Sequence, residues 1–270
     1  MPLLEIDRVA AIVLRQFYLI RGSMARFLPL VVWVVVDMML WGFLSRYLNT
    51  VASPGFNFVP ALLGAVLLWD FFIRVTQGVT TAFLEEIWTR NLLNIFAAPL
   101  SIAEYLAGLV VTSISTSAIG LATMLLLATF AFGLSFAVYG LMVYPFVLVL
   151  FLFGISMGVF ASALVLRLGP AAEWFVWPIP ALVSPFAGVF YPLASLPKWM
   201  QFVSRLMPPA YVFESMRTIL AGGGVPGRTL VLGAALAVGY VVLACGTFFC
   251  VYRGAVRTGL IARYSAESVN

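Results

Sequence analysis

Asp70 and Arg74 carry opposite charges four residues apart in an apolar run at about 58–82. An i,i+4 spacing places both side chains on one face of a helix, with the acid N-terminal to the base. Charged groups are costly inside a membrane, so they persist where they pair, face protein or face water. Two interpretations follow: a structural ion pair that locks one helix to its neighbour, or a direct role in a transport path. Together with Asp37, these residues are the candidate polar groups within the membrane.

The chain as a whole is more apolar than soluble proteins are. Of its 270 residues, 63% are hydrophobic and 9% are charged, and the mean hydropathy is +1.09. Soluble globular chains have about 45–50% apolar residues. We therefore predict an all-α polytopic membrane protein, in contact with membrane lipid.

The residue types exclude several kinds of chemistry. The chain has no His, which excludes Ser-His-Asp and Cys-His catalysis and His-ligated metal sites. Cys245 and Cys250 lie in an apolar run and are interpreted as small hydrophobic residues. The single lysine, Lys198, follows Ser-Leu-Pro rather than a Gly-rich loop, so the chain lacks a Walker motif. We predict no enzyme activity and no cofactor or metal in this chain. Scattered arginines make nucleic acid a poor explanation for the net charge of +5.

Membrane crossing requires about 20 mainly apolar residues in a helix. Six stretches qualify, at about 27–45, 58–82, 102–130, 140–166, 171–191 and 229–252. The fifth holds three prolines, Pro178, Pro180 and Pro185, so it must be kinked or broken. We predict a transmembrane domain at 27–252 and a cytoplasmic tail at 253–270.

The N-terminal segment differs from the six stretches. Between Ile6 and Ile20, apolar residues recur at helical spacing, whereas Asp7, Arg8 and Arg15 lie elsewhere on the helical wheel. This pattern is typical of an amphipathic helix in the headgroup plane. We predict a cytoplasmic interfacial helix within residues 1–26; a water-facing helix is the alternative.

Cationic residues indicate the orientation, because cytoplasmic loops are enriched in Lys and Arg. With both termini inside, nine fall on the inner side, namely Arg8, Arg15, Arg21, Arg26, Arg90, Arg167, Arg253, Arg257 and Arg263. Five fall outside, namely Arg46, Lys198, Arg205, Arg217 and Arg228. The distribution favours cytoplasmic termini.

Two connections carry more apolar residues than free loops do. Residues 83–99, between spans two and three, combine charges with a helical apolar pattern and end at Pro99. They predict a short amphipathic helix on the cytoplasmic face, either a docking element or a plain interfacial helix. Residues 192–228 contain two short helix candidates, at about 197–206 and 210–220, which we expect to dip into the outer leaflet.

Close helix contact is indicated at two further places. Gly154 and Gly158 form a GxxxG motif in span four, and Ser113 and Ser117 a small-xxx-small motif in span three. Contact within one chain and dimerisation are both open.

This order of parts resembles the type-2 ABC exporter permeases, the family of polysaccharide, nodulation-factor and drug exporters. Residues 90–101 (RNLLNIFAAPLS) are similar to its coupling-helix region. Residues 192–199 (PLASLPKW) and 208–217 (PPAYVFESMR) are similar to its outer re-entrant signature, with a Pro pair and a Glu-x-x-Arg. The resemblance covers nearly the whole chain.

The resemblance implies a half-transporter in a bacterial plasma (inner) membrane. Two copies of a separate ABC ATP-binding subunit would bind ATP and Mg and dock on two permease subunits, as a homodimer. The coupling helix would lie at about 84–97, with Glu85, Glu86, Arg90 and Asn91 touching the ATPase. Re-entrant outer helices between spans five and six, at about 192–224, would form a gate around Pro208, Pro209, Tyr211, Glu214 and Arg217. Glu214 and Arg217, three residues apart, could instead simply pair with each other.

The expected function is therefore ATP-driven export of an amphipathic molecule, such as a lipid-linked glycan, a lipid or a hydrophobic drug. One alternative is a secondary transporter driven by an ion gradient, with Asp37, Asp70 and Arg74 as its relay. Another is a membrane assembly subunit that transports nothing.

Overall fold

The computed structural model describes residues 5–51, 59–224 and 227–260, and these residues contain helices but no β-strand. The all-α prediction is therefore confirmed for this part of the chain. Parts of the predicted interfacial segment (1–4), of span two (58), of the outer connection (225–226) and of the tail (261–270) lie outside the described residues.

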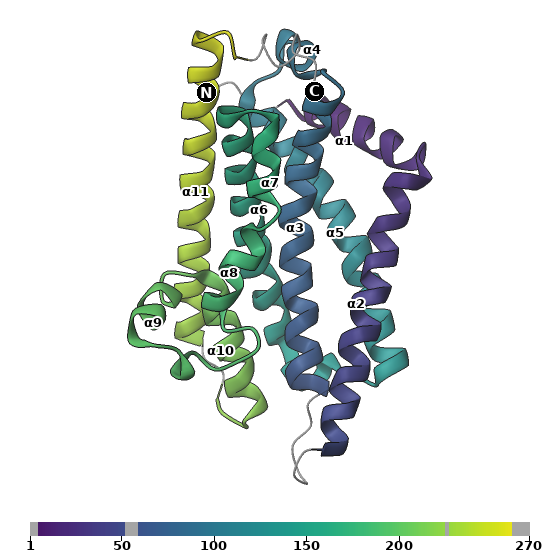
Figure 1. Cartoon of the computed structure of the whole chain (residues 1–270), viewed down its shortest axis with the longest axis vertical. Coiled ribbons are helices and arrows are strands. Elements are labelled where there is room, and N and C mark those ends of the chain that lie inside the picture. The colour runs from purple at the N-terminus through teal and green to yellow at the C-terminus, as the bar shows by residue number, and fades with distance from the viewer. Residues whose placement is uncertain (1–4, 52–58, 225–226, 261–270) are drawn as a thin grey trace.

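The amphipathic N-terminal helix forms as expected. Helix α1 (Ile6–Arg21) lies within the predicted segment 1–26, and Gly22 caps its C-terminal end. Figure 1 shows α1 crossing one end of the helical bundle at a steep angle to the long helices, next to the short helix α4 (Leu92–Ala97). This end is called the α4 end below. The location of α1 in a membrane interface stays a prediction.

Five helical segments of the described residues are long and apolar enough to cross a membrane: Arg26–Val51, Val59–Trp88, Ile102–Phe132, Val138–Leu168 and Gly227–Arg257. They correspond to predicted spans one to four and six. The helices within them are α2 (Met24–Val51), α3 (Gly64–Trp88), α5 (Ile102–Phe132), α6 (Val143–Leu168) and α11 (Gly227–Arg257). A short π-helix, η1 (Val59–Leu63), precedes α3, and a short 3-10 segment interrupted at Gly140, η2 (Phe136–Met142), precedes α6.

The fifth predicted span is not one long helix. Residues 171–191 contain η3 (Pro170–Ala172), α7 (Glu173–Val176) and α8 (Ile179–Ala187). Pro178 and Pro180 have no N–H to donate to the preceding turn, which explains the interruption between α7 and α8. Gly188 ends α8 with a left-handed φ of +67°. The expected break is confirmed, but the described residues hold five long helices rather than six.

Short helices fill the connection before α11. They are η4 (Leu193–Ser195), α9 (Lys198–Ser204) and α10 (Pro208–Leu220), near the predicted 197–206 and 210–220. Pro208 and Pro209 occupy the first turn of α10, where a missing N–H costs no helical hydrogen bond. Figure 1 shows α9 and α10 at the end of the bundle opposite α4, called the α10 end below.

Helix α3 is the centre of the bundle, and small residues bring its neighbours close. A Cβ on Gly158 of α6 would lie 2.7 Å from Val79 Cβ and 2.8 Å from the Thr76 carbonyl oxygen. Ser113 of α5 donates a hydrogen bond of 2.9 Å to the Val75 carbonyl oxygen. The GxxxG and small-xxx-small motifs thus both make contacts within the chain, against α3.

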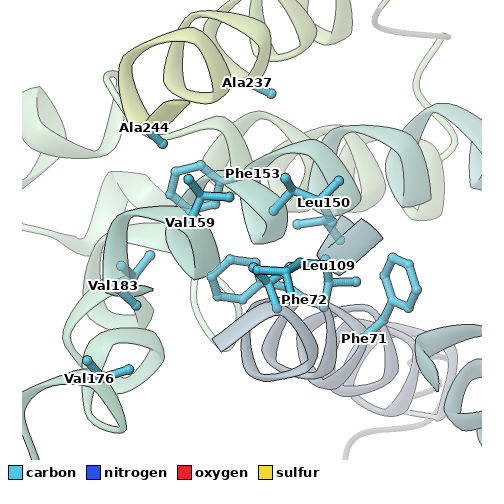
Figure 2. Packing of buried hydrophobic residues seen from close by; sticks show 14 of the residues in the cluster. Phe71, Phe72, Leu109, Leu150, Phe153, Val159, Val176, Val183, Ala237 and Ala244 are labelled. Carbon is cyan, nitrogen blue, oxygen red and sulfur yellow. The ribbon is translucent and has the colours of Figure 1, made fainter. Parts of the chain in front are cut away.

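Aromatic rings fill the space between these close contacts. Phe72 of α3 and Phe153 of α6 stack with ring centroids 5.4 Å apart, and Figure 2 shows both among the buried side chains between these helices. In Figure 2, Ala237 and Ala244 lie on the side of α11 that faces this cluster. Helix α3 is therefore fixed on two sides, by α5 and α6.

Candidate functional site

A cavity of about 750 Å³ lies beside α3, and no described residue of α6 lines it. Helices α1, α2, α3 and α5 contribute to its walls, together with Trp177, which follows α7. It extends from Thr89, at the α4 end, to Asp37 and Asp70, deeper in the bundle. Proteins bind small molecules in concave sites of roughly this size.

One face of α3 supplies a stripe of polar side chains to the cavity. Asp70, Arg74, Gln77, Thr81 and Glu85 all line it, at steps of three or four residues. This spacing keeps them on a single helix face. The residues between them, such as Val75 and Val79, are fully buried against α6 and α5. Helix α3 therefore packs with one apolar face on its neighbours and presents a polar face to the cavity.

Asp70 and Arg74 form the predicted ion pair, with 3.0 Å between Arg74 Nε and Asp70 Oδ2. Their side chains are 12% and 13% exposed, respectively, and both line the cavity. The stem of Arg74 lies against α5, since a Cβ on Gly120 would come within 2.8 Å of Arg74 Cδ. The pair thus belongs to one helix, packs on a second helix and faces an open space.

Asp37 reaches the same cavity from α2. It is half-buried, and it makes no hydrogen bond or ion pair with another described residue. Trp33 precedes it by four residues on the same helix face and also lines the cavity. The structure brings all three intramembrane candidates, Asp37, Asp70 and Arg74, to one cavity.

A second ion pair lies nearer the α4 end of the cavity. Arg26 Nε is 3.1 Å from Glu85 Oε1, and the Glu85 side chain is 12% exposed. Arg26 lies in the first turn of α2, and Glu85 lies in the last turn of α3. The pair therefore joins the ends of α2 and α3 beside the cavity.

Two buried carboxylates hold α1 across the end of the bundle. Glu86, which is 1% exposed, accepts from Arg15 and, at 3.4 Å, from Gln16 Nε2. Glu104 of α5 accepts from the backbone N–H of Glu5 at 3.1 Å and lies 3.6 Å from Arg8 Nη1. Glu104 also forms a capping box with Ser101, which fixes the start of α5. Helix α1 is therefore tied to both α3 and α5.

At the α10 end, Glu214 and Arg217 pair with each other at 3.1 Å, as the spacing allowed. Glu214 Oε1 also accepts from the Leu193 N–H at 2.8 Å. Arg217 donates to the carbonyl oxygens of Gly188 and Val189. The Glu-x-x-Arg motif thus holds the end of α8 and the start of η4 against α10.

The other outer candidates are structural in the same way. Tyr211 Oη donates to the Arg205 carbonyl oxygen at 2.7 Å, which closes the turn between α9 and α10. Pro208 and Pro209 are buried at the start of α10. None of these residues lines the cavity beside α3.

Comparison with known families gives a decisive result. The sequence profile of the ABC-2 type transporters matches residues 8–221, from α1 to the residue after α10. The chain belongs to the ABC-2 type transporter family. No curated protein sequence matches it. As an ABC-2 membrane domain it is a multi-pass transport subunit, and domains of this kind generally pair with ATP-binding subunits.

The segment at 84–97 of this ABC-2 chain, where a single coupling helix is expected, differs in shape from that expectation. Residues 84–88 complete α3, a turn follows, and α4 covers only Leu92–Ala97. Arg90 causes the interruption, because its φ of +54° is left-handed and cannot continue a helix. Arg90 is exposed, whereas Asn91 is half-buried and donates to Glu86 Oε2 at 3.0 Å. Glu85 and Glu86 have partners within the chain.

The polar stripe on α3 in this ABC-2 chain includes two residues that are not among the predicted site residues. Gln77 and Thr81 were not singled out from the sequence, although they continue the spacing of Asp70 and Arg74. Polar residues at steps of three or four over 70–85 are the signal that could have identified them. A hydropathy average along the chain does not show this spacing, because apolar residues surround each polar residue.

Proposed function

We propose that this chain is the permease subunit of an ATP-driven exporter of an amphipathic molecule. The observation that carries the proposal is the polar cavity beside α3, in a chain of the ABC-2 type transporter family. An apolar bundle needs no charged, open interior to be stable, and charged groups within a membrane mark substrate or ion pathways. The cavity opens toward the α4 end, where the substrate enters from the cytoplasm or the inner leaflet.

Two copies of a separate ABC ATP-binding subunit dock on the α4 end and bind the ATP and Mg. Arg90, Leu93 and Asn94 are exposed and form the contact surface on and beside α4. Glu85 and Glu86 lie behind this surface, bonded to Arg26 and Arg15. Displacement of α4 and the end of α3 by the ATPase therefore moves α1 and the start of α2, which form cavity walls. Coupling requires ATP to favour one arrangement of these helices by several kcal/mol.

The chain crosses the bacterial plasma membrane six times, and α7 and α8 form the broken fifth crossing. Trp88 Nε1 donates to Glu173 Oε2 at 3.0 Å, which supports a start for α7 near the α4 end. Phe190 stacks on Trp41 of α2 at 5.2 Å, farther toward the α10 end. Phe96 of α4 contacts Tyr252 of α11 at 4.7 Å, so α11 returns to the α4 end. An even number of crossings places both termini on the same side, and the excess of arginines on that side supports the cytoplasm.

A second copy of the chain completes the transport path as a homodimer, and the short helices α9 and α10 dip into the outer leaflet. Helices α2 and α11 leave most of their apolar surface uncovered within the chain, so both have surface available to lipid or to a second copy. The Glu214–Arg217 cluster fixes the backbone around η4 and serves as the frame of an outer gate.

The test is reconstitution of the permease with its ATPase in vesicles. We expect ATP-dependent movement of a labelled amphiphile, and loss of coupling or assembly in Arg90→Glu. Arg228→Glu is the matched control, because Arg228 is an exposed cation in the first turn of α11, away from α4. Equal export and assembly in both variants would refute the docking surface. Transport that fails when the proton gradient collapses, with ATP maintained, would indicate a secondary transporter instead.

A further inference from the structure

The charges around the cavity do not balance. Among the described residues, five charged side chains line it, and four form the pairs Arg26–Glu85 and Asp70–Arg74. Asp37 is the fifth and has no hydrogen-bond or ion-pair partner among the described residues. The cavity therefore carries an excess of one negative charge, on the helix that faces α3.

A carboxylate in such surroundings favours a cation. Asp37 loses hydration in this half-buried position and gains no compensating hydrogen bond from a described residue, and its attraction to Arg74 is shared with Asp70. A bound ammonium group would supply both a charge and hydrogen-bond donors. An anionic ligand would meet repulsion from the same group, since both arginines are already paired with carboxylates.

Aromatic side chains line the same cavity as Asp37. Trp33 lies one turn away on α2, and Trp177 reaches the cavity from the segment between α7 and α8. Trp is the aromatic residue whose ring face attracts a cation most strongly. A carboxylate with neighbouring indole rings is a combination that recognises an amine.

An apolar pocket of about 260 Å³ adjoins the polar cavity. Val13, Phe17 and Ile119 line it, from α1 and α5. The exposed Arg21, at the end of α1, also contributes to its wall. Ile20, Thr112 and Thr116 line both spaces, so the two share a wall. The two adjoining spaces, one lined by charged residues and one apolar, match a molecule with a polar head and an apolar tail.

We propose that the cavity selects an amphipathic molecule with a protonated amine, binding the ammonium group at Asp37 and the apolar tail in the pocket beneath α1. The assignment rests on the proposed export function and narrows its substrate class. The amine could belong to a membrane lipid headgroup or to a free cationic amphiphile, which share this chemistry.

Binding to the purified permease tests the assignment without the ATPase, so its failure is distinct from failure of the export assay. Labelled decylamine and decanol are equilibrated with the protein in uncharged maltoside micelles, with protein-free micelles as the blank. The wild-type chain should bind decylamine about tenfold more tightly than decanol, as expected for one charged hydrogen-bonded contact. Asp37→Asn should abolish this preference, and Asp37→Glu should retain most of it.

Asp7→Asn is the matched control, because Asp7 is an exposed carboxylate on α1 that lines neither space. It should keep the tenfold preference. Equal binding of the two ligands by the wild-type chain overturns the proposal, even if Asp37→Asn does not fold. An unchanged preference in folded Asp37→Asn also overturns it.

Lipids that co-purify with the protein identify the source of the amine. Less phosphatidylethanolamine on Asp37→Asn than on Asp7→Asn supports a lipid headgroup. Equal amounts of this lipid, with the decylamine preference still lost in Asp37→Asn, support a free cationic amphiphile.

Discussion

Arg15 of α1 forms an ion pair with Glu86, a carboxylate that is 1% exposed near the end of α3. Without Arg15, Glu86 keeps only the amide groups of Gln16 and Asn91 as donors from side chains. Loss of one partner of a buried charge is costly because the other stays desolvated. The contact ties the amphipathic helix to the central helix of the bundle.

We therefore expect Arg15→Ala to destabilise the protein by about 2 kcal/mol, or roughly 4–8 °C in Tm. Thermal unfolding of the detergent-solubilised protein measures the change. Arg21→Ala, on the exposed end of α1, should shift Tm by less than about 2 °C. Adding Glu86→Gln to Arg15→Ala should recover part of the loss, and strict additivity of the two would argue against the pair.

Because α3 and α6 are in close contact at Gly158, a larger side chain at this position should lower the stability of the protein. A Cβ there would meet the Thr76 carbonyl oxygen at 2.8 Å, so Gly158→Ala should separate the helices at a cost of about 1–3 kcal/mol. Gly239→Ala on α11 is the control, because its Cβ would meet nothing within 4 Å. It should be neutral or stabilise the helix by about 0.5–1 kcal/mol. Similar Tm values for the two variants would contradict the close packing.

The Asp70–Arg74 pair has a structural and a pathway interpretation, and neutral substitutions separate them. Asp70→Asn and Arg74→Gln should each lower Tm, whereas the double variant should be more stable than the sum of both predicts. If the pair is structural only, transport in the double variant should match the wild type. If it belongs to the pathway, transport should fall at least tenfold in the double variant while Tm largely recovers.

The Arg217 contacts predict a local effect at the α10 end. Arg217→Met removes the donors to Gly188 and Val189 and leaves Glu214 without its cation. Amide hydrogen exchange over residues 188–196 should become at least tenfold faster, because these bonds hold that backbone. Arg205→Met should leave the same amides protected, since Arg205 makes its hydrogen bonds to described residues through its backbone carbonyl and N–H groups. Unchanged exchange in Arg217→Met would refute the clamp.

The sequence was a good guide where local pattern decides the structure. Apolar runs predicted α2, α3, α5, α6 and α11, and three prolines predicted the interruption before α8. It was a poorer guide at the end of α3. The helical pattern continues through residues 84–97, but Arg90 adopts a left-handed backbone conformation. An arginine in the sequence does not predict that conformation, which glycine adopts far more readily.

Among the site residues, spacing predicted the two contacts that are local in sequence. The pairs Asp70–Arg74 and Glu214–Arg217 follow from steps of four and three residues. Glu85 and Glu86 could not be assigned in this way. Their partners, Arg26 and Arg15, lie far away in the chain, and only the packing of α1 and α2 on α3 brings them together.

By itself, the sequence determined that the chain is helical, apolar and built to cross a membrane. Composition and the spacing of apolar residues are sufficient for this, because neither depends on tertiary contacts. Only the tertiary structure decided which charged residues pair across helices and which line the cavity. Asp37 and Asp70 are both acidic residues in apolar helices, and the sequence distinguishes them only by the arginine four residues after Asp70. Their difference arises because Arg74 lies one turn from Asp70 on α3, whereas α2 places Asp37 in the cavity without a basic neighbour on its own helix face.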